Sequence, residues 1–126
     1  MSRESSKLPD AAWPAEQAVA ELRTTFSSRH DALACGTRLV EQGLVACVQI
    51  EGPLTSVYRW QGVVETAEEY ACRVKTTPAA AAACEAAMRS LHPYDTPEIL
   101  ISVSYGSVGY AVWVRDNVTT DTEARE

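Results

Sequence analysis

The segment with the clearest potential for chemistry runs from His92 to Glu98 and reads HPYDTPE. A proline favours an extended conformation in the residue before it, so Pro93 and Pro97 are predicted to stiffen the chain. Asp95 could accept hydrogen bonds from nearby backbone N–H groups and close the turn between them. The sequence therefore predicts a rigid corner that keeps an imidazole, a phenol and a carboxylate within reach of one another.

This corner has a functional and a structural interpretation. In the first, His92, Tyr94 and Glu98 bind a divalent cation or a small polar ligand, since imidazole nitrogens and carboxylate oxygens are common metal ligands. In the second, the corner is a stiff connector between a helix and a strand, because one His with one Glu supplies too few ligands for a specific metal site. From the residues alone the structural interpretation is favoured, and His92 and Glu98 are the candidate metal ligands.

Aromatic side chains form a second candidate group. Tyr58 and Trp60 are two residues apart, so in a strand they share one face. With Lys75 as a cation, such side chains could line a pocket for a small anionic or mixed ligand between subunits. They could equally form the core of a subunit interface, where Tyr and Trp are enriched; this role is favoured, and the two roles are compatible. The whole group is Tyr58, Trp60, Lys75, Tyr94, Tyr110 and Trp113.

The remaining chemistry-bearing residues give little sign of catalysis. Cys35, Cys47, Cys72 and Cys84 include no C-x-x-C pair, and we interpret them as small buried hydrophobic residues. Cys47 and His92 could be imagined as nucleophile and base, but no third orienting group accompanies them. The chain also lacks G-x-S-x-G and H-E-x-x-H motifs, so the sequence predicts that the protein is not an enzyme.

Three helices are predicted to position these residues. The clearest lies between residues 27 and 43, with Ser28 as N-cap, Asp31 as its capping partner and Gly43 in the left-handed C-terminal position. A second is expected from Pro78 to Leu91, because proline suits a first helical turn and apolar residues follow at helical spacing. A third, short helix covers residues 108–118.

Strand signals fill the intervening sequence. Gly52-Pro53 is expected to kink a strand rather than end it, and Gln61-Gly62 to form a hairpin turn, with residues 63–69 as the ragged start of the returning strand. Residues 18–26 are ambiguous, because Ala, Glu and Leu favour a helix whereas their apolar residues alternate as in a strand. Four other segments are rich in Val, Ile, Tyr or Cys and bounded by Gly or Pro, namely 44–50, 54–61, 70–76 and 98–105.

If residues 18–26 form a strand, the element order becomes strand, helix, strand, strand, helix, strand, followed by the short helix. This order predicts an α+β, ferredoxin-like βαββαβ sandwich with a long hairpin over residues 54–76. Two helices cover only one face of such a sheet, yet residues 44–50 and 98–105 carry apolar side chains on both faces. A homo-oligomer would cover the second face and protect the open sheet edges.

Composition narrows the class of protein. The chain has 126 residues, 46% of them hydrophobic, which predicts one soluble domain over residues 16–118, with flexible tails at 1–15 and 119–126. A net charge of -6 without a basic cluster disfavours nucleic acid as a partner. The apolar runs fall far short of the ~20 residues that span a bilayer, and no signal-peptide pattern is seen. We therefore expect no membrane partner and a cytoplasmic location.

Several motifs together resemble the CutA family of divalent-cation tolerance proteins. The resemblance covers nearly all of residues 18–117 and implies a ferredoxin-like protomer in a tight homotrimer, similar in architecture to the PII signalling proteins. It also implies that residues 18–26 are the first strand, and a role linked to copper and other divalent cations. The motifs are Val45-Ala46-Cys47-Val48, residues 56–62 (SVYRWQG), Glu69, Lys75-Thr76, residues 92–99, and Tyr110 with Trp113.

The resemblance also bears on individual residues. Some bacterial members use a Cys at the end of the first strand and a His pair before the proline as metal ligands. These positions are Thr24, Leu91 and His92 here, so His92 alone is kept. Cys47 belongs to the family's Ala-Cys motif, and in a strand it is expected to be packed rather than coordinating. Pro93, Asp95 and Pro97 are carried over as structural residues of the corner.

The resemblance thus implies a homotrimer that binds divalent cations. Copper or another divalent cation would be a non-obligatory ligand. The cation, and any small ligand, would bind at clefts between subunits. Two alternatives stay open. One is a PII-like trimer that senses a small molecule or anion, and the other is a purely structural trimer that scaffolds a partner protein.

Overall fold

The computed structural model describes residues 13–119 of the chain. Of the predicted tails, residues 1–12 and 120–126 lie outside the described residues. Trp13 stacks on Tyr105, with ring centroids 6.4 Å apart. The elements are, in chain order, β1 (Ala18–Phe26), α1 (Arg29–Glu41), β2 (Cys47–Trp60), β3 (Val63–Thr76), α2 (Ala81–Leu91), β4 (Ile99–Tyr105) and α3 (Val108–Asp116), with short 3-10 turns at Ala15–Gln17 and Pro78–Ala80.

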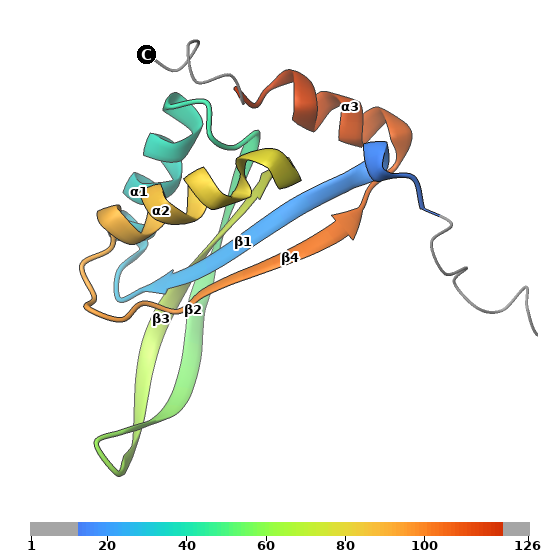
Figure 1. The fold of residues 1–126 in the computed structure, drawn as a ribbon. Helices are drawn as coiled ribbons and strands as arrows, with labels where there is room; N and C mark the ends of the chain where they lie inside the picture. Colours follow the sequence, from blue (N-terminus) through green and yellow to red (C-terminus); the bar gives the residue numbers. More distant parts are fainter. Residues whose placement is uncertain (1–12, 120–126) are drawn as a thin grey trace, which may run out of the picture.

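Within residues 13–119 the strands form one antiparallel sheet of four strands in the order β2-β3-β1-β4. The helices α1 and α2 cover one face of this sheet, and α3 lies across the end where β1 begins (Figure 1). The mixed α+β architecture predicted from the sequence is therefore confirmed, and the ambiguous segment 18–26 is the strand β1. No helix in the described range is long and apolar enough to cross a membrane.

The strands β2 and β3 are longer than the sequence indicated. The predicted strands 44–50 and 54–61 are one strand of 14 residues that begins at Cys47, with a register irregularity between Glu51 and Leu54. Residues 63–69 pair regularly rather than forming a ragged start. The kink at Gly52-Pro53 thus shifts the pairing without ending it, because a bulge adds residues to one strand while the ladder continues.

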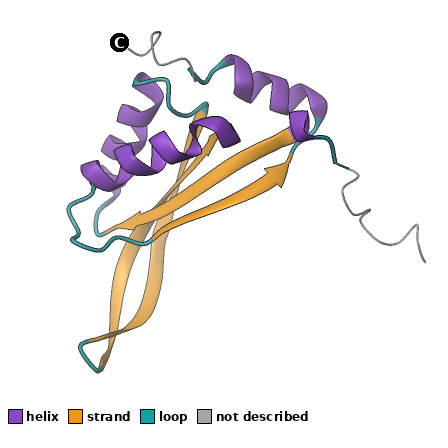
Figure 2. Cartoon of the chain, viewed as in Figure 1, coloured by secondary structure: helices purple, strands orange, loops and turns teal. Residues whose placement is uncertain are grey.

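The far part of these two strands projects beyond the helices as an arm, which we call the hairpin arm (residues 54–69; Figure 2). Its tip is the predicted turn, where Gln61 and Gly62 have φ of 50° and 82°. Two left-handed residues match the twist of a two-residue hairpin. Tyr58 and Trp60 belong to the outer part of this arm, which lies beyond the helices.

The main core lies between the sheet and the helices α1 and α2. It contains Leu22 and Phe26 of β1 packed against Leu39 of α1 and Met88 of α2, all of them nearly inaccessible to solvent. The alternating strand residues on this face meet the apolar stripe of each helix. A second, smaller cluster joins Val19, Ala80, Ala111, Val114 and Val118, and it fixes α3 against the start of β1.

Helix caps form as the sequence predicts. The Ser28 hydroxyl accepts a hydrogen bond from the N–H of Asp31 at the start of α1, and Gly43 is left-handed with φ of 74° after its end. The Thr77 hydroxyl accepts from the N–H of Ala80, so the predicted helix over 78–91 opens as a 3-10 turn and continues as α2. The end of α2 at Leu91 delivers the chain directly to His92.

Gly36 lies where α1 packs on β2. A Cβ added there would lie 2.4 Å from Cγ1 of Val48, whose branched side chain cannot easily rotate away. We expect Gly36→Ala to lower the free energy of unfolding by roughly 1 to 2 kcal/mol, because overpacking outweighs the gain in helix propensity. Gly109→Ala, in α3 with no side chain or other element within 4 Å of the added Cβ, should raise it by about 0.5 to 1 kcal/mol.

Urea unfolding at one fixed protein concentration measures both changes. A Gly36→Ala protein that is as stable as the unmodified one would contradict this account of the contact between α1 and β2.

Candidate functional site

The His92 ring is enclosed at the start of the connector, which we define as residues 92–98. It stacks on Phe26 with centroids 4.2 Å apart and an interplanar angle of 10°. Its Nε2 lies 2.8 Å from the carbonyl oxygen of Thr25, and its Nδ1 accepts a hydrogen bond of 3.2 Å from the N–H of Tyr94. A carbonyl only accepts, so Nε2 carries the proton and the ring is the neutral tautomer. Both ring nitrogens are therefore occupied by backbone groups.

The environment of His92 reinforces the neutral state. The residue is only 9% exposed, and burial lowers the pKa of its imidazole below the usual value, while the Thr25 carbonyl and the carboxylates of Glu69 and Asp31 partly oppose this shift. A neutral ring without a free nitrogen has no lone pair to give to a metal ion. In the structure His92 joins the connector to the end of β1.

Glu98 takes a partner that the sequence did not predict. Its carboxylate forms an ion pair with Arg23, with 2.7 Å between Nη1 and Oε2, rather than with His92 or Lys75. The candidate ligands His92 and Glu98 are thus not brought together as a metal site. Among the described residues there is no group of three or more His, Cys, Asp or Glu side chains placed to hold a metal ion.

A large cleft opens between the hairpin arm and the connector, and we call it the arm-connector cleft. Its volume is about 920 Å³. It brings together three of the predicted aromatic residues, Tyr58 and Trp60 from β2 and Tyr94 from the connector. Besides these, its lining includes five acidic residues, Glu65, Glu68, Glu69, Asp95 and Glu98.

The electrostatics of the arm-connector cleft are one-sided. Within the part of the chain that the structure describes, no Lys, Arg or His lines it. The Tyr94 hydroxyl donates to Glu69 across 3.4 Å, and burial, with the negative charge of Glu69 as a smaller contribution, raises the pKa of Tyr94. The surplus of carboxylates favours a cationic ligand and opposes the small anion suggested by the sequence.

The other three members of the predicted group lie elsewhere, toward α3. Tyr110 and Trp113 stack with centroids 5.7 Å apart, and the Tyr110 hydroxyl lies 3.7 Å from Sγ of Cys47. Burial, with a contribution from the Cys47 thiol, raises the pKa of Tyr110 to about 12. Lys75 donates to Gln49 and is paired with Cys47 in the sheet, so it does not supply a cation to the aromatic cleft.

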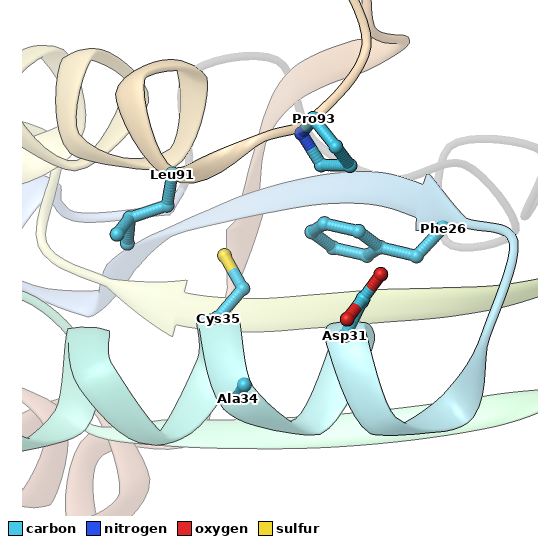
Figure 3. A pocket seen from close by; sticks show the side chains of 6 residues that line it. All are labelled: Phe26, Asp31, Ala34, Cys35, Leu91 and Pro93. Atoms are coloured by element: carbon cyan, nitrogen blue, oxygen red, sulfur yellow. The ribbon is translucent and has the colours of Figure 1, made fainter.

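A second cavity, of about 170 Å³, lies between α1 and the end of α2 (Figure 3). Phe26, Leu91 and Pro93 surround the thiol of Cys35 there, with Asp31 as the one charged lining residue. Cys35, Cys72 and Cys84 are buried as predicted, and burial raises the pKa of Cys84 to about 12. This cavity is much smaller than the arm-connector cleft.

Sequence reasoning missed the acidic wall of the arm-connector cleft. Glu65 and Glu69 project from the same face of β3 as Ala67, and Glu65 is paired directly with Tyr58 across the hairpin. In the sequence, Glu65, Ala67 and Glu69 already stand two residues apart, the spacing that places side chains on one face of a strand. Treating residues 63–69 as a ragged segment concealed that they belong to a regular strand with a defined face.

Comparison with known proteins identifies the family of the chain. Residues 21–117 match the family described as CutA1 divalent ion tolerance protein. This chain belongs to the CutA1 family. The resemblance seen in the sequence motifs is therefore confirmed. The names of the family and of the Thermus thermophilus relative below describe tolerance to divalent cations rather than a catalysed reaction.

The relatives cover most of the folded part. The chain is 40% identical over 94 residues to the divalent-cation tolerance protein CutA of Thermus thermophilus, covering 74% of this chain and 91% of that protein. The CutA homolog of Xenopus laevis is 36% identical over 64% of this chain, which spans only about half (54%) of that relative. A solved structure of the divalent cation tolerance protein (Cut A1) from Thermus thermophilus matches with a TM-score of 0.75 and 37% identity, over 80% of this chain and 99% of that chain.

The state of His92 leads to a pH dependence of stability. Because its pKa is lowered in the folded protein, the unfolded chain binds the proton more readily below about pH 6.5. The stability contributed by neutral His92 is complete above that pH and is lost as the pH falls toward the lower pKa of the folded state. We expect the melting temperature to fall more between about pH 7.5 and pH 5.5 than it does for His92→Gln, which cannot titrate.

The control is His30→Gln, which changes an exposed residue of α1 and should keep the full pH dependence. If His92→Gln and the unmodified protein lose stability equally on acidification, the neutral, buried state assigned to His92 is wrong.

Proposed function

We propose that the protein acts in tolerance of divalent cations, copper among them, as a homotrimer that binds the cation at clefts between its protomers. The observation that carries this proposal is the arm-connector cleft, whose carboxylates create a region of negative potential open to solvent. The cytoplasmic location expected from the sequence remains a prediction.

The trimer is supported by the exposed strand β4. Leu100, Ile101 and Val103 are 59%, 52% and 53% exposed, although they alternate between the two faces of an edge strand. An exposed apolar edge is prone to pair with another chain, and a closed oligomer protects it. The strand order β2-β3-β1-β4 with two helices on one face supports the ferredoxin-like sandwich that such a trimer would be built from.

Binding between protomers is supported by the shortage of ligands within one. The described residues hold no group of three potential metal ligands, so a specific site needs further ligands from water or from a neighbouring protomer. In the arm-connector cleft, Glu65 and Glu69 are the carboxylates that share one face of β3. A neighbouring arm or connector could complete the coordination around them.

Two other functions compete with this one. A PII-like sensor of small molecules would use the same cleft, but the acidic lining makes an anion an unfavourable ligand. A structural trimer that scaffolds a partner protein would bind neither ion nor small ligand.

The trimer predicts a mass of about three times 13.7 kDa by light scattering coupled to gel filtration. Ile101→Glu should place a charge in the subunit contact and shift the protein toward monomer, because an unpaired buried charge is costly. Val40→Glu, at a 43% exposed position of α1, is the matched control and should stay trimeric. A monomer of the unmodified protein at micromolar concentration would refute the assembly.

Cation binding is tested by titrating metal-free protein with Cu(II), Zn(II) and Cd(II) in a calorimeter. We expect saturable binding whose affinity falls roughly thirtyfold when Glu65→Gln and Glu69→Gln are combined, since each lost carboxylate removes on the order of 1 kcal/mol of attraction. Glu41→Gln combined with Asp116→Asn changes two exposed carboxylates outside the cleft and controls for the same change in net charge. Binding that the double variant leaves intact, or no heat above that of a buffer blank, would exclude the proposed site.

A further inference from the structure

The main core contains three cysteines, Cys35 of α1, Cys72 of β3 and Cys84 of α2, which we call the cysteine cluster. Each of them is at most 4% exposed. Burial explains their apolar surroundings but not why thiols from three different elements belong to one cluster, since other small side chains also fill a core. The cluster lies beneath α1 and α2, so access to it does not depend on the sheet edge or the hairpin arm, where protomers are expected to meet.

The cavity between α1 and the end of α2 gives this cluster a connection to solvent. The Cys35 sulfur points into it between Leu91 and Phe26 (Figure 3). The cavity volume of about 170 Å³ is several times the roughly 30 Å³ that one water molecule takes up in the liquid, so a small ion fits with part of its hydration shell. Among the described residues that line the cavity, Asp31 alone is charged, and its carboxylate attracts cations.

Cys35 and Cys72 interact directly. A hydrogen bond between their side chains lowers the pKa of Cys35, against the opposing effect of burial, and together with burial it raises the pKa of Cys72. Cys72 is therefore the donor, and the Cys35 sulfur takes the negative charge when the pair loses a proton. Metal ions are ligated by the thiolate rather than by the thiol. The pair thus supplies a thiolate more readily than an isolated buried cysteine does.

Thr24 adds a hydroxyl to the same part of the core. Its side chain is inaccessible to solvent, and its Oγ1 has no hydrogen-bond partner among the described residues. Thr24 pairs directly with Cys72 across β1 and β3, and it stands two residues from Phe26, so its hydroxyl lies on the core face of the sheet. An unpaired buried hydroxyl is destabilising, and a thiolate sulfur would be its acceptor. Thr24 is therefore placed to stabilise negative charge beside Cys72.

We propose that the sulfurs of Cys35 and Cys72 bind a soft monovalent metal ion such as Cu(I), which enters through the cavity. Soft sulfur ligands select Cu(I) over hard cations. Cu(I) forms stable complexes with two sulfur atoms, whereas Zn(II) and Ca(II) need larger sets of ligands, and the described residues hold no group of three. The thiol protons pass to solvent as the ion binds. This site goes beyond the proposed function, because its position, its ligands and the charge of its ion all differ.

The test is a competition for Cu(I) between the full-length protein and bicinchoninate, a chelator whose Cu(I) complex is coloured. Oxygen is excluded and ascorbate keeps the copper reduced. We expect the protein to take one Cu(I) per protomer from the chelator. Cys35→Ala and Cys72→Ala should each weaken the apparent affinity by about a hundredfold or more, because a single sulfur remains as ligand.

Two other cysteines provide matched controls. Cys47→Ala removes the partly exposed thiol outside the cluster, and Cys84→Ala removes a buried thiol of the cluster that is not a proposed ligand. Both variants should keep the uptake of Cu(I). Circular dichroism shows whether each variant is folded, and if Cys72→Ala is not, Cys35→Ala at the cavity decides the question. The proposal is overturned if the unmodified protein takes up no Cu(I), if Cys35→Ala leaves uptake unchanged, or if Cys84→Ala weakens uptake as much as Cys35→Ala.

The outcome is distinguishable from that of the divalent-metal titrations. The combined variant Glu65→Gln and Glu69→Gln, which should weaken the binding of divalent cations, should leave the uptake of Cu(I) unchanged. Divalent binding without uptake of Cu(I) would overturn this inference and leave the proposed function standing. Uptake of Cu(I) that depends on Cys35, without any divalent binding, would support the inference and overturn the proposed role of the cleft.

Discussion

The His92 side chain holds the connector against the end of β1, and the position of the arm-connector cleft depends on this attachment. One ring nitrogen is bound to the Thr25 carbonyl, the other accepts from the Tyr94 N–H, and the ring stacks on Phe26. The prolines at 93 and 97 restrict the backbone on either side. Together these contacts hold Tyr94 and Glu98 opposite the hairpin arm, so the residue that resembles a metal ligand has a positioning role.

The two faces of the sheet carry different kinds of side chain. The face under α1 and α2 buries Leu22, Phe26 and Val74 and supplies the core. The other face carries the pairs Arg23 with Glu98 and Arg73 with Glu51, and these partly exposed ion pairs contribute little to stability. Most of the exposed large apolar residues lie on β4, on the hairpin arm and on α3. The features that suggest assembly and binding therefore lie outside the core that folds the protomer.

Local signals in the sequence predicted much of the fold. Ser28 and Gly43 bounded the first helix correctly, and Gln61-Gly62 formed the predicted turn, because caps and turns depend on residues close together in the chain. The partners of Lys75 and Glu98 were not predictable in the same way. Glu98 lies beside Arg23 because Thr24 of β1 pairs with Ile99 of β4. Arg23 and Glu98 are 75 residues apart in the chain, so no local pattern in the sequence indicates their contact. Only the folded sheet shows which charges share a face.

Diffraction from crystals soaked in a copper or zinc salt tests the central claim most directly, with data collected at the absorption edge of the metal. The claim is that His92 positions the arm-connector cleft and that the carboxylates of the cleft attract the cation. The account predicts an anomalous peak beside Glu65 and Glu69, with the His92 ring still bound to the Thr25 carbonyl. A peak on a ring nitrogen of His92, with that hydrogen bond broken, would contradict it.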